Sequence, residues 1–240
     1  MFVIHDRVFQ LQLWFSPWHY PGGALAGVDC VAHFTDRHGS VCMPAELALH
    51  QLTPAQQGRL FDKQLMRLEA GAAIFQRRGL TVSVVIGEVM AQTLLLNHGL
   101  AARLGRLDFV QLAIGEDFPG LGEGRHHRLL RRLSQQFPLA LTRFGAGIAP
   151  CRAVFDGLFQ RVTLDKSFVR KRMARPSFEP FMRALVLQIT PSCPLMVVDG
   201  IDSDVARRRV LGAGFGAMQG ALWPPLEAQS FLRRFGQAQQ

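Results

Sequence analysis

Two hydrophobic patterns alternate along the chain, and they predict two kinds of element. Residues 81–86 (TVSVVI) form a nearly unbroken β-branched run, which is typical of a strand buried on both faces of a parallel sheet. Residues 53–79 instead repeat apolar side chains at helical spacing, and Thr53, Pro54 and Gln56 occupy the positions of an N-terminal capping box. The second stretch therefore predicts a long helix that lies with one face on the core and ends at Gly79.

The same patterns continue on both sides of these elements. Residues 9–18 and 23–34 flank a Pro-Gly-Gly turn and predict an antiparallel hairpin. Residues 138–172 predict a βαβ unit of a parallel sheet, with strands over 139–144 and 161–164 around a Gly-rich turn and a helix over about 150–159. Further helices are expected over 88–104, 123–137, 178–190 and 204–211, and further strands over 108–114 and 194–201.

This order of elements predicts an α/β fold. Strand and helix alternate from about residue 80 onward, which favours a mostly parallel sheet with helices on its outside. The chain has 240 residues, 48% of them hydrophobic, so it can bury one large core. No repeat or low-complexity linker interrupts it, and residues 1–240 are expected to form a single domain.

The charge of the chain narrows the kind of partner. Lys and Arg outnumber Asp and Glu by 27 to 18, which gives a net charge of +9 and favours an acidic protein, nucleic acid or anionic lipid. The N-terminus lacks the pattern of a signal peptide, and the apolar runs are shorter than the ~20 residues of a membrane helix. We therefore expect a cytoplasmic chain without membrane association. The four cysteines form no C-x-x-C pair, so we expect reduced thiols and no metal.

The βαβ unit also carries a resemblance to a known family. EAL domains, the cyclic-di-GMP phosphodiesterases, have the signature D-D-F-G-x-G followed by K-x-D, and these places read TRFGAG over 142–147 and TLD over 163–165. Other family motifs match in order over residues 9–235. The resemblance implies a TIM-barrel-like EAL fold, a mostly parallel barrel with an antiparallel N-terminal strand and with any pocket at the carboxyl ends of its strands.

The resemblance further implies which positions once formed the family's pocket, where active relatives hold Mg²⁺ or Mn²⁺ in a carboxylate-rich site. These vestigial positions are Asp29, His33, Glu46, Val85, Gln111, Thr142, Arg143, Thr163, Asp165, Asp199, Asp202 and Gln219. His33 stands where the family has an Arg that grips a substrate phosphate, and Thr163 stands where it has the catalytic Lys.

Several of these replacements remove the chemistry of the site. Val85 replaces an Asn ligand, and an apolar side chain cannot hold a divalent cation. Gln111 replaces a carboxylate with a neutral amide, and Arg143 replaces one with a cation, which at ~4 Å and an effective dielectric of about 20 changes the energy of an ion by roughly 4 kcal/mol. We therefore expect no catalytic residue, no cofactor and no bound metal.

The residues that remain have simpler interpretations as well. Gly145 and Gly147 are interpreted as turn residues that need positive φ rather than as a phosphate cradle. Asp165 is expected to cap a helix that begins at Lys166, and Glu46 to favour a helix dipole.

A closer resemblance implies the biological role. Long, nearly gap-free segments are similar to a non-catalytic branch of EAL-like proteins that represses flagellar genes: 43–47 (MPAEL), 119–124 (PGLGEG), 153–169, 177–189 and 218–225 (MQGALWPP). Members of this branch bind the FlhD subunit of the flagellar master regulator FlhDC, block its engagement with promoters and do not bind cyclic-di-GMP productively. The resemblance therefore implies FlhD, within FlhDC, as the partner.

Other functions stay open at this stage. A cyclic-di-GMP receptor without hydrolysis is one, with Arg143, Asp165 and Gln219 at the barrel mouth. Another is residual phosphodiesterase activity that uses the carboxylates of Asp29 and Asp199. Direct, specific DNA binding is not expected, because there is no helix-turn-helix pattern and only one Tyr.

The sequence says little about where a partner binds. Arg125, Arg128 and Arg132 recur at i, i+3 and i+7 in the predicted helix over 123–137, and they are either a solvated face or a docking surface for an acidic partner. In the same segment His126 and His127 are expected on different helix faces and therefore not as joint metal ligands.

Overall fold

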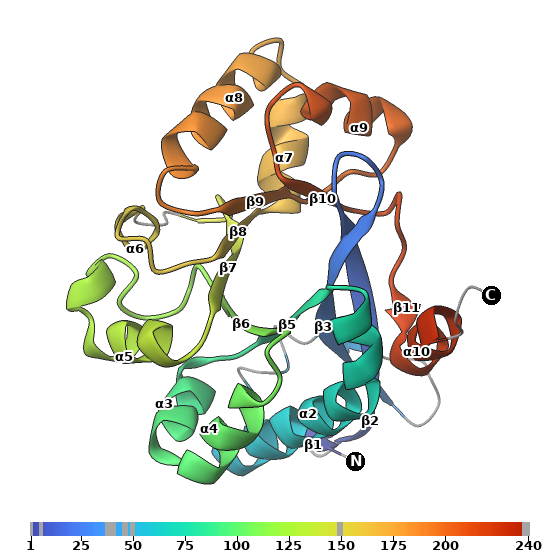
Figure 1. The fold of residues 1–240 in the computed structure, drawn as a ribbon, viewed down its shortest axis with the longest axis vertical. Helices are drawn as coiled ribbons and strands as arrows, with labels where there is room; N and C mark the ends of the chain where they lie inside the picture. The colour runs from blue at the N-terminus through green and yellow to red at the C-terminus, as the bar shows by residue number, and fades with distance from the viewer. Residues whose placement is uncertain are drawn as a thin grey trace.

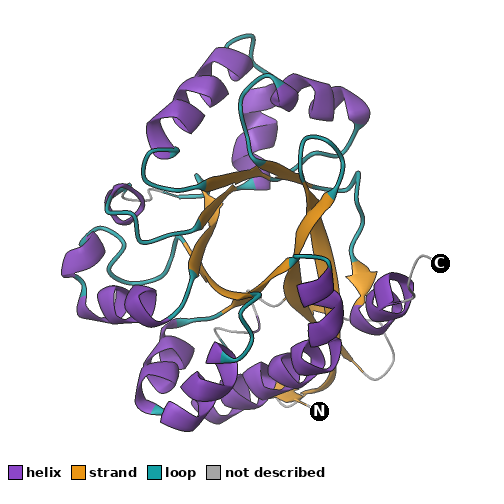
Figure 2. Cartoon of the chain, viewed as in Figure 1, coloured by secondary structure: helices purple, strands orange, loops and turns teal. Residues whose placement is uncertain are grey.

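Eight strands close into a barrel, and helices surround it (Figure 2). The structure is a computed structural model that describes residues 2–4, 7–36, 42–44, 48, 51–147 and 151–236. The barrel strands are β2 (Arg7–His19), β3 (Leu25–Asp36), β5 (Thr81–Val85), β6 (Val110–Gly115), β7 (Leu139–Phe144), β8 (Arg161–Leu164), β9 (Leu195–Val198) and β10 (Ala217–Gln219). All neighbours are parallel except β2, which runs antiparallel to both β3 and β10 and closes the barrel. The predicted mostly parallel barrel with an antiparallel N-terminal strand is confirmed.

Short elements extend this framework. β1 (Phe2–Ile4) and β11 (Leu226–Glu227) pair with β2, and β4 (Cys42–Pro44) pairs with β3. The helices are α2 (Pro54–Arg77), α3 (Glu88–Leu96), α4 (His98–Gly105), α5 (Arg128–Gln136), α6 (Arg152–Phe155), α7 (Lys166–Met173), α8 (Phe178–Ile189), α9 (Asp204–Leu211) and α10 (Ala228–Gly236), with a 3₁₀ turn η1 (Gly124–His126) before α5. None of the described helices is long and apolar enough to cross a membrane.

The two faces of each strand differ in chemistry. Outward side chains such as Val84, Leu112 and Leu141 are buried in a large apolar core that also contains helix residues. Inward side chains of the same barrel are polar or small, and they include Ser83 and Gln111. Because side chains alternate across a strand, the apolar layer lies between barrel and helices, and the polar layer lines the barrel interior.

Helix α2 forms as its sequence predicts. The amide of Gln56 donates to the Thr53 hydroxyl at 3.3 Å, and the amide of Thr53 donates to the side chain of Gln56 at 2.8 Å, which completes the capping box. Phe75 on its buried face packs edge-on against Phe15 of β2, with ring centroids 5.6 Å apart. The C-terminal helix α10 packs beside α2 (Figure 1), where Phe231 joins the same aromatic cluster.

Several predicted boundaries were wrong, each for a local reason. The helix expected over 88–104 is two helices, because Asn97 accepts from the amide of Leu100 at 3.0 Å and starts α4 afresh. The helix expected over 150–159 is only α6, because the chain turns at Gly157 with φ +71°. The strand expected over 194–201 is limited to β9, and the strand expected over 108–114 begins two residues later, as β6.

Candidate functional site

A buried ion pair occupies the interior of the barrel. Arg161 begins β8, and its guanidinium Nη2 donates to the Asp29 carboxylate at 2.7 Å and to the Ser83 hydroxyl at 2.7 Å. The guanidinium also lies 5.0 Å from the ring centroid of Trp18. The side chains of Arg161 and Asp29 are only 1% and 13% exposed, so the charges face each other with little solvent between them.

This pair changes what Asp29 can do. Asp29 matches the family's name-giving carboxylate, and in this chain its charge is opposed by a cation that the protein itself supplies. A buried ion pair offsets its desolvation only while both partners remain, and breaking one typically costs about 3–5 kcal/mol. The charge of Asp29 is therefore balanced by Arg161 within the chain.

Arg161 is the residue that the sequence reasoning missed. The signal was present in β8, where Arg161 and Thr163 alternate with the apolar Val162 and Leu164 and so share one face of the strand. Recognising that this face points into the barrel required knowing that the interior is polar.

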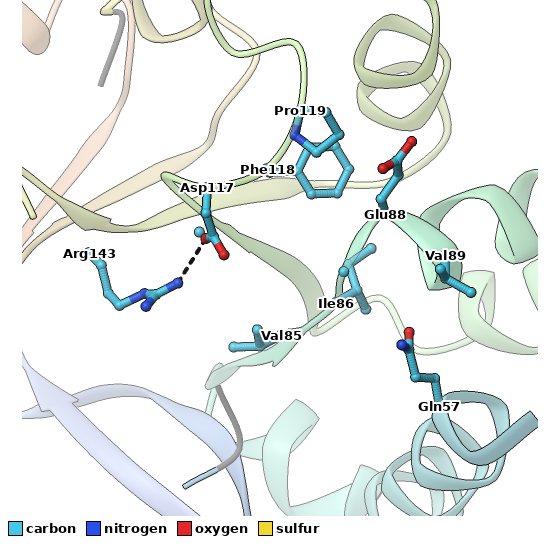
Figure 3. A pocket seen from close by; sticks show the side chains of 11 residues that line it. Gln57, Val85, Ile86, Glu88, Val89, Asp117, Phe118, Pro119 and Arg143 are labelled. Atoms are coloured by element: carbon cyan, nitrogen blue, oxygen red, sulfur yellow. Dashed lines mark hydrogen bonds and ion pairs between the residues drawn. The ribbon is translucent and has the colours of Figure 1, made fainter. Parts of the chain in front are cut away.

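The mouth of the barrel holds a pocket of ≈ 320 Å³ at the carboxyl ends of β5, β6 and β7. Figure 3 shows Arg143 and Asp117 pointing toward one another across it, while Val85, Ile86 and Phe118 form apolar walls. Nη2 of Arg143 lies 2.8 Å from the Asp117 carboxylate. The pocket thus includes two of the predicted positions, Val85 and Arg143, together with Asp117, which the sequence reasoning did not identify.

The backbone places Arg143 in an unusual conformation. Its φ is 58°, in the left-handed region, and the pairing of β7 with β8 shifts register between Leu141 and Phe144. For a residue with a side chain this conformation costs about 1–2 kcal/mol, and the ion pair with Asp117 accompanies it. Arg143 therefore projects a cation toward the pocket.

The Gly-rich turn after β7 binds a carboxylate of the same chain. The amide of Gly145 donates to Glu116, and the amide of Gly147 donates to the other oxygen of Glu116 at 2.6 Å. Successive backbone amides of this kind form an anion site, and here Glu116 fills it. Gly145 has φ +94°, as predicted, but Gly147 is not among the positive-φ glycines, so that part of the prediction was wrong.

Three remaining carboxylates have separate roles. Asp165 caps α7 as predicted, accepting from the amides of Ser167 and Phe168 at 2.8 and 3.0 Å. Asp202 accepts from the amide of Ala221 and from Arg170, and these contacts hold its pKa below the ordinary value although partial burial opposes them. Burial, together with the charge of Asp29, raises the pKa of Asp199 to about 6.

The other predicted positions do not assemble around an ion. Thr142 donates to the carbonyl of Ile114 at 3.1 Å, and Gln111 donates to the carbonyl of Leu139 at 3.3 Å. The ring of His33 lies 5.7 Å from that of Trp14. Thr163 is buried, Gln219 is half-buried on β10, and Glu46 lies outside the described residues.

The donor set does not fit the divalent ions of the EAL family. Within the ranges that the structure describes, no three side chains of His, Cys, Asp or Glu converge in a way that could hold a metal ion. The observation that decides the fit is the pairing of Asp29 with Arg161, because a hard cation requires carboxylate oxygens that are not already neutralised.

Comparison with known proteins identifies the family. No protein-family model matches the chain. It is 38% identical over 228 residues to the anti-FlhC(2)FlhD(4) factor YdiV of Salmonella typhimurium (strain 14028s), and the match covers 95% of this chain and 96% of the relative. The chain belongs to the YdiV family.

Solved structures agree with this assignment. The crystal structure of the EAL-like domain protein YdiV superposes with a TM-score of 0.88 at 34% identity, covering 98% of this chain and 100% of that chain. The EAL enzyme Bd1971, in its cAMP and cyclic-di-GMP bound form, has a TM-score of 0.76 at 14% identity over 94% of this chain and 64% of that one, which shows the shared fold. The resemblance inferred from the sequence is thus confirmed.

One predicted surface of this YdiV-family chain needs correction. Arg125 lies in η1 rather than in α5, and its guanidinium donates to the backbone carbonyl of Asp156 at 3.1 Å through Nε. Arg125 therefore does not share a helix with Arg128 and Arg132. His126 also belongs to the 3₁₀ turn and His127 is the N-cap of α5, so the predicted helix over 123–137 begins only at Arg128.

Proposed function

We propose that this chain is an anti-FlhDC factor, a non-enzymatic regulator that binds the FlhD subunit of FlhDC, blocks its binding to promoter DNA and lowers flagellar gene expression. The observation that carries the proposal is the 38% identity to the anti-FlhC(2)FlhD(4) factor YdiV, because it extends over 95% of the chain. The similarity thus spans the whole domain rather than a single motif.

The barrel interior supports a role without catalysis. Hydrolysis by metal-activated water needs retained cations and an open coordination position. The Asp29 carboxylate is paired with Arg161, and in the pocket at the mouth the Asp117 carboxylate is paired with Arg143. A titration with Mn²⁺ and cyclic-di-GMP should give no linear dinucleotide; turnover that is lost in Asp29→Asn would contradict this part.

The same residues make the alternative of a cyclic-di-GMP receptor less favourable. Arg143 already has a carboxylate partner in Asp117, and the resemblance places His33 where the family holds a phosphate with Arg. An imidazole ring lacks the planar fork of donors with which a guanidinium binds a phosphate. We therefore expect no productive binding of the nucleotide, and calorimetry with cyclic-di-GMP at high micromolar concentration should show no heat of binding.

The binding of FlhDC is tested by mixing the purified chain with the FlhC(2)FlhD(4) complex of its own organism. One co-eluting peak in size-exclusion chromatography with light scattering is the expected result. Two separate peaks at micromolar concentrations of both proteins would contradict the proposal.

A further inference from the structure

The helices after β8 form a strongly basic lobe on one side of the barrel. Helices α7, α8 and α9 lie together there (Figure 1). Residues 166–211 contain nine Lys and Arg but only four Asp and Glu, so this segment carries more than half of the net charge of +9. The lobe is therefore a part of the surface that attracts an acidic partner.

Four of the nine basic side chains in the lobe have polar partners within the chain. Arg170 donates to Asp202 through two nitrogens, and Arg209 lies 3.2 Å from the carboxylate of Glu179. Arg207 donates to the carbonyl of Pro21 at 3.1 Å, and Arg183 donates to the carbonyl of Gly212 at 3.2 Å. These four arginines therefore contact groups of the same chain.

Three of the other cations lie around one pocket, and we call them the α7 cluster: Lys171, Arg172 and Arg175. They line a pocket of ≈ 290 Å³ together with Gly145, Ala146, Asp165, Ser167 and Phe168. The carboxylate of Asp165 is engaged there by two backbone amides as the N-cap of α7. Lys171 and Arg175 are exposed, Arg172 is half-buried, and within the described part of the chain no carboxylate lies at ion-pair distance from any of them. Cations in the last turn of a helix favour its dipole, but Arg175 lies beyond the end of α7.

Arg172 is held in place before any partner arrives. Its guanidinium lies 4.3 Å from the ring centroid of Phe181 and 5.4 Å from that of Phe168. An arginine that stacks on aromatic rings keeps its N–H edges free for bidentate contact with a carboxylate. Because its rotamers are already restricted, less conformational entropy is lost when an anion binds.

We propose that the α7 cluster binds an acidic segment, rich in Asp and Glu, on the FlhDC partner; this docking site rests on the proposed function. The carboxylates contact Arg172 at the wall of the pocket, while Lys171 and Arg175 flank it. The contact supplies orientation and association rate, as charged groups at the edge of an interface do.

Two other occupants fit the cluster less well. Proteins that bind duplex DNA through phosphates contact about 6–10 of them, whereas the α7 cluster offers three cations within five consecutive residues. A second copy of this chain that bound through the same face would place like charges opposite each other, because a two-fold interface is self-complementary.

The proposal is tested with the double variant Lys171→Glu/Arg175→Glu. Affinity for purified FlhDC is measured by calorimetry at about 0.1 M and about 1 M salt, between which the Debye length falls from about 10 Å to about 3 Å. The variant is expected to lose at least about tenfold in affinity at low salt and to show a weaker salt dependence than the unaltered chain. Arg128→Glu/Arg132→Glu on α5 makes the same change of charge elsewhere and should bind within about twofold of the unaltered chain. Lys171→Arg/Arg175→Lys, which keeps both charges, should bind normally.

The possible results separate the two proposals. Unchanged binding by Lys171→Glu/Arg175→Glu, or an equal loss in the α5 variant, would overturn the docking site alone. No binding by the unaltered chain would overturn the proposed function and the docking site with it. The last measurement is a titration of the chain with promoter DNA in the absence of FlhDC. DNA binding that depends on Lys171 and Arg175 would overturn the proposal that the α7 cluster binds an acidic protein segment, and would indicate nucleic acid as its ligand. Circular dichroism of each variant checks that the fold is retained.

Discussion

Among the arginines that stack on aromatic rings in this molecule, Arg161 and Arg172 have opposite surroundings. Arg161 lies 5.0 Å from the ring centroid of Trp18 inside the barrel, is 1% exposed and holds the carboxylate of Asp29. Arg172 lies 4.3 Å from that of Phe181 on the outer lobe and is half-buried without a carboxylate at ion-pair distance among the described residues. Arg161 is thus used within the fold, whereas Arg172 is the cation that we propose for contact with an acidic partner.

The comparison also indicates how charged groups are kept inside the barrel without a bound ion. A cluster of carboxylates without a cation would repel each other in a desolvated interior. Arg161 supplies a positive charge inside the chain, and the amides of Gly145 and Gly147 are likewise satisfied by Glu116. Charges that a ligand could balance are thus balanced by the protein.

The largest expected effect is at the buried pair. Asp29→Ala leaves the guanidinium of Arg161 buried beside Ser83 with no counter-charge, so the free energy of unfolding should fall by about 3–5 kcal/mol. Asp29→Asn keeps a hydrogen-bond acceptor and should cost less. Urea denaturation of the unaltered chain and the two variants measures these free energies of unfolding. A loss below about 1 kcal/mol for Asp29→Ala would show that the ion pair does not stabilise the barrel interior.

A smaller effect, of opposite sign, is expected at Asp199. Burial raises the pKa of this carboxyl from 3.8 to about 6, so the folded state binds its proton more tightly than the unfolded state does. Stability is therefore lost as pH rises from about 4 to about 6, and the loss is complete above that range. Asp199→Asn cannot ionise, so relative to the unaltered chain it should gain about 3 kcal/mol at pH 8 and close to nothing at pH 4. Thermal unfolding at both pH values checks this; an equal difference at both would contradict the raised pKa.

At the edge of the basic lobe, the helix cap offers a more modest test. Asp165→Ala removes the acceptor for two amides at the start of α7 and should cost about 1 kcal/mol. Asp165→Ser keeps an acceptor in this position and should recover most of the loss. If Asp165→Ala unfolds like the unaltered chain in urea, the cap does not stabilise the helix that carries the α7 cluster.

The smallest effect is expected at an exposed ion pair, which is the counterpart of the buried one. The carboxylate of Glu69 lies 2.6 Å from Arg103, and both side chains are about one-third exposed. Glu69→Gln should lower the free energy of unfolding by only about 0.2–1 kcal/mol, and less in high salt. A loss comparable to that of Asp29→Ala would remove the distinction between buried and exposed pairs.

How much of this could be predicted from the sequence depends on the range of the interactions. The capping box at Thr53 and the cap at Asp165 were predicted correctly because each is decided within four residues of chain. The barrel followed from the order of strands and helices and from the family motifs. The pair of Asp29 with Arg161 could not be predicted, because it joins residues 132 positions apart and depends on which strand face points inward. Arg125 was misplaced because the amide of that residue donates to Asp156, a contact across 31 positions that the local pattern does not reveal.

We propose that the chain acts by binding a protein and that no reaction is catalysed in the barrel interior. The most direct test is the fluorescence anisotropy of labelled promoter DNA bound to FlhDC, recorded as this chain is added in the presence and absence of Mn²⁺ and cyclic-di-GMP. We predict that the DNA is released as the chain approaches stoichiometric amounts, with the same curve under both conditions. DNA that stays bound in the presence of excess chain, or release that requires the nucleotide, would contradict the account.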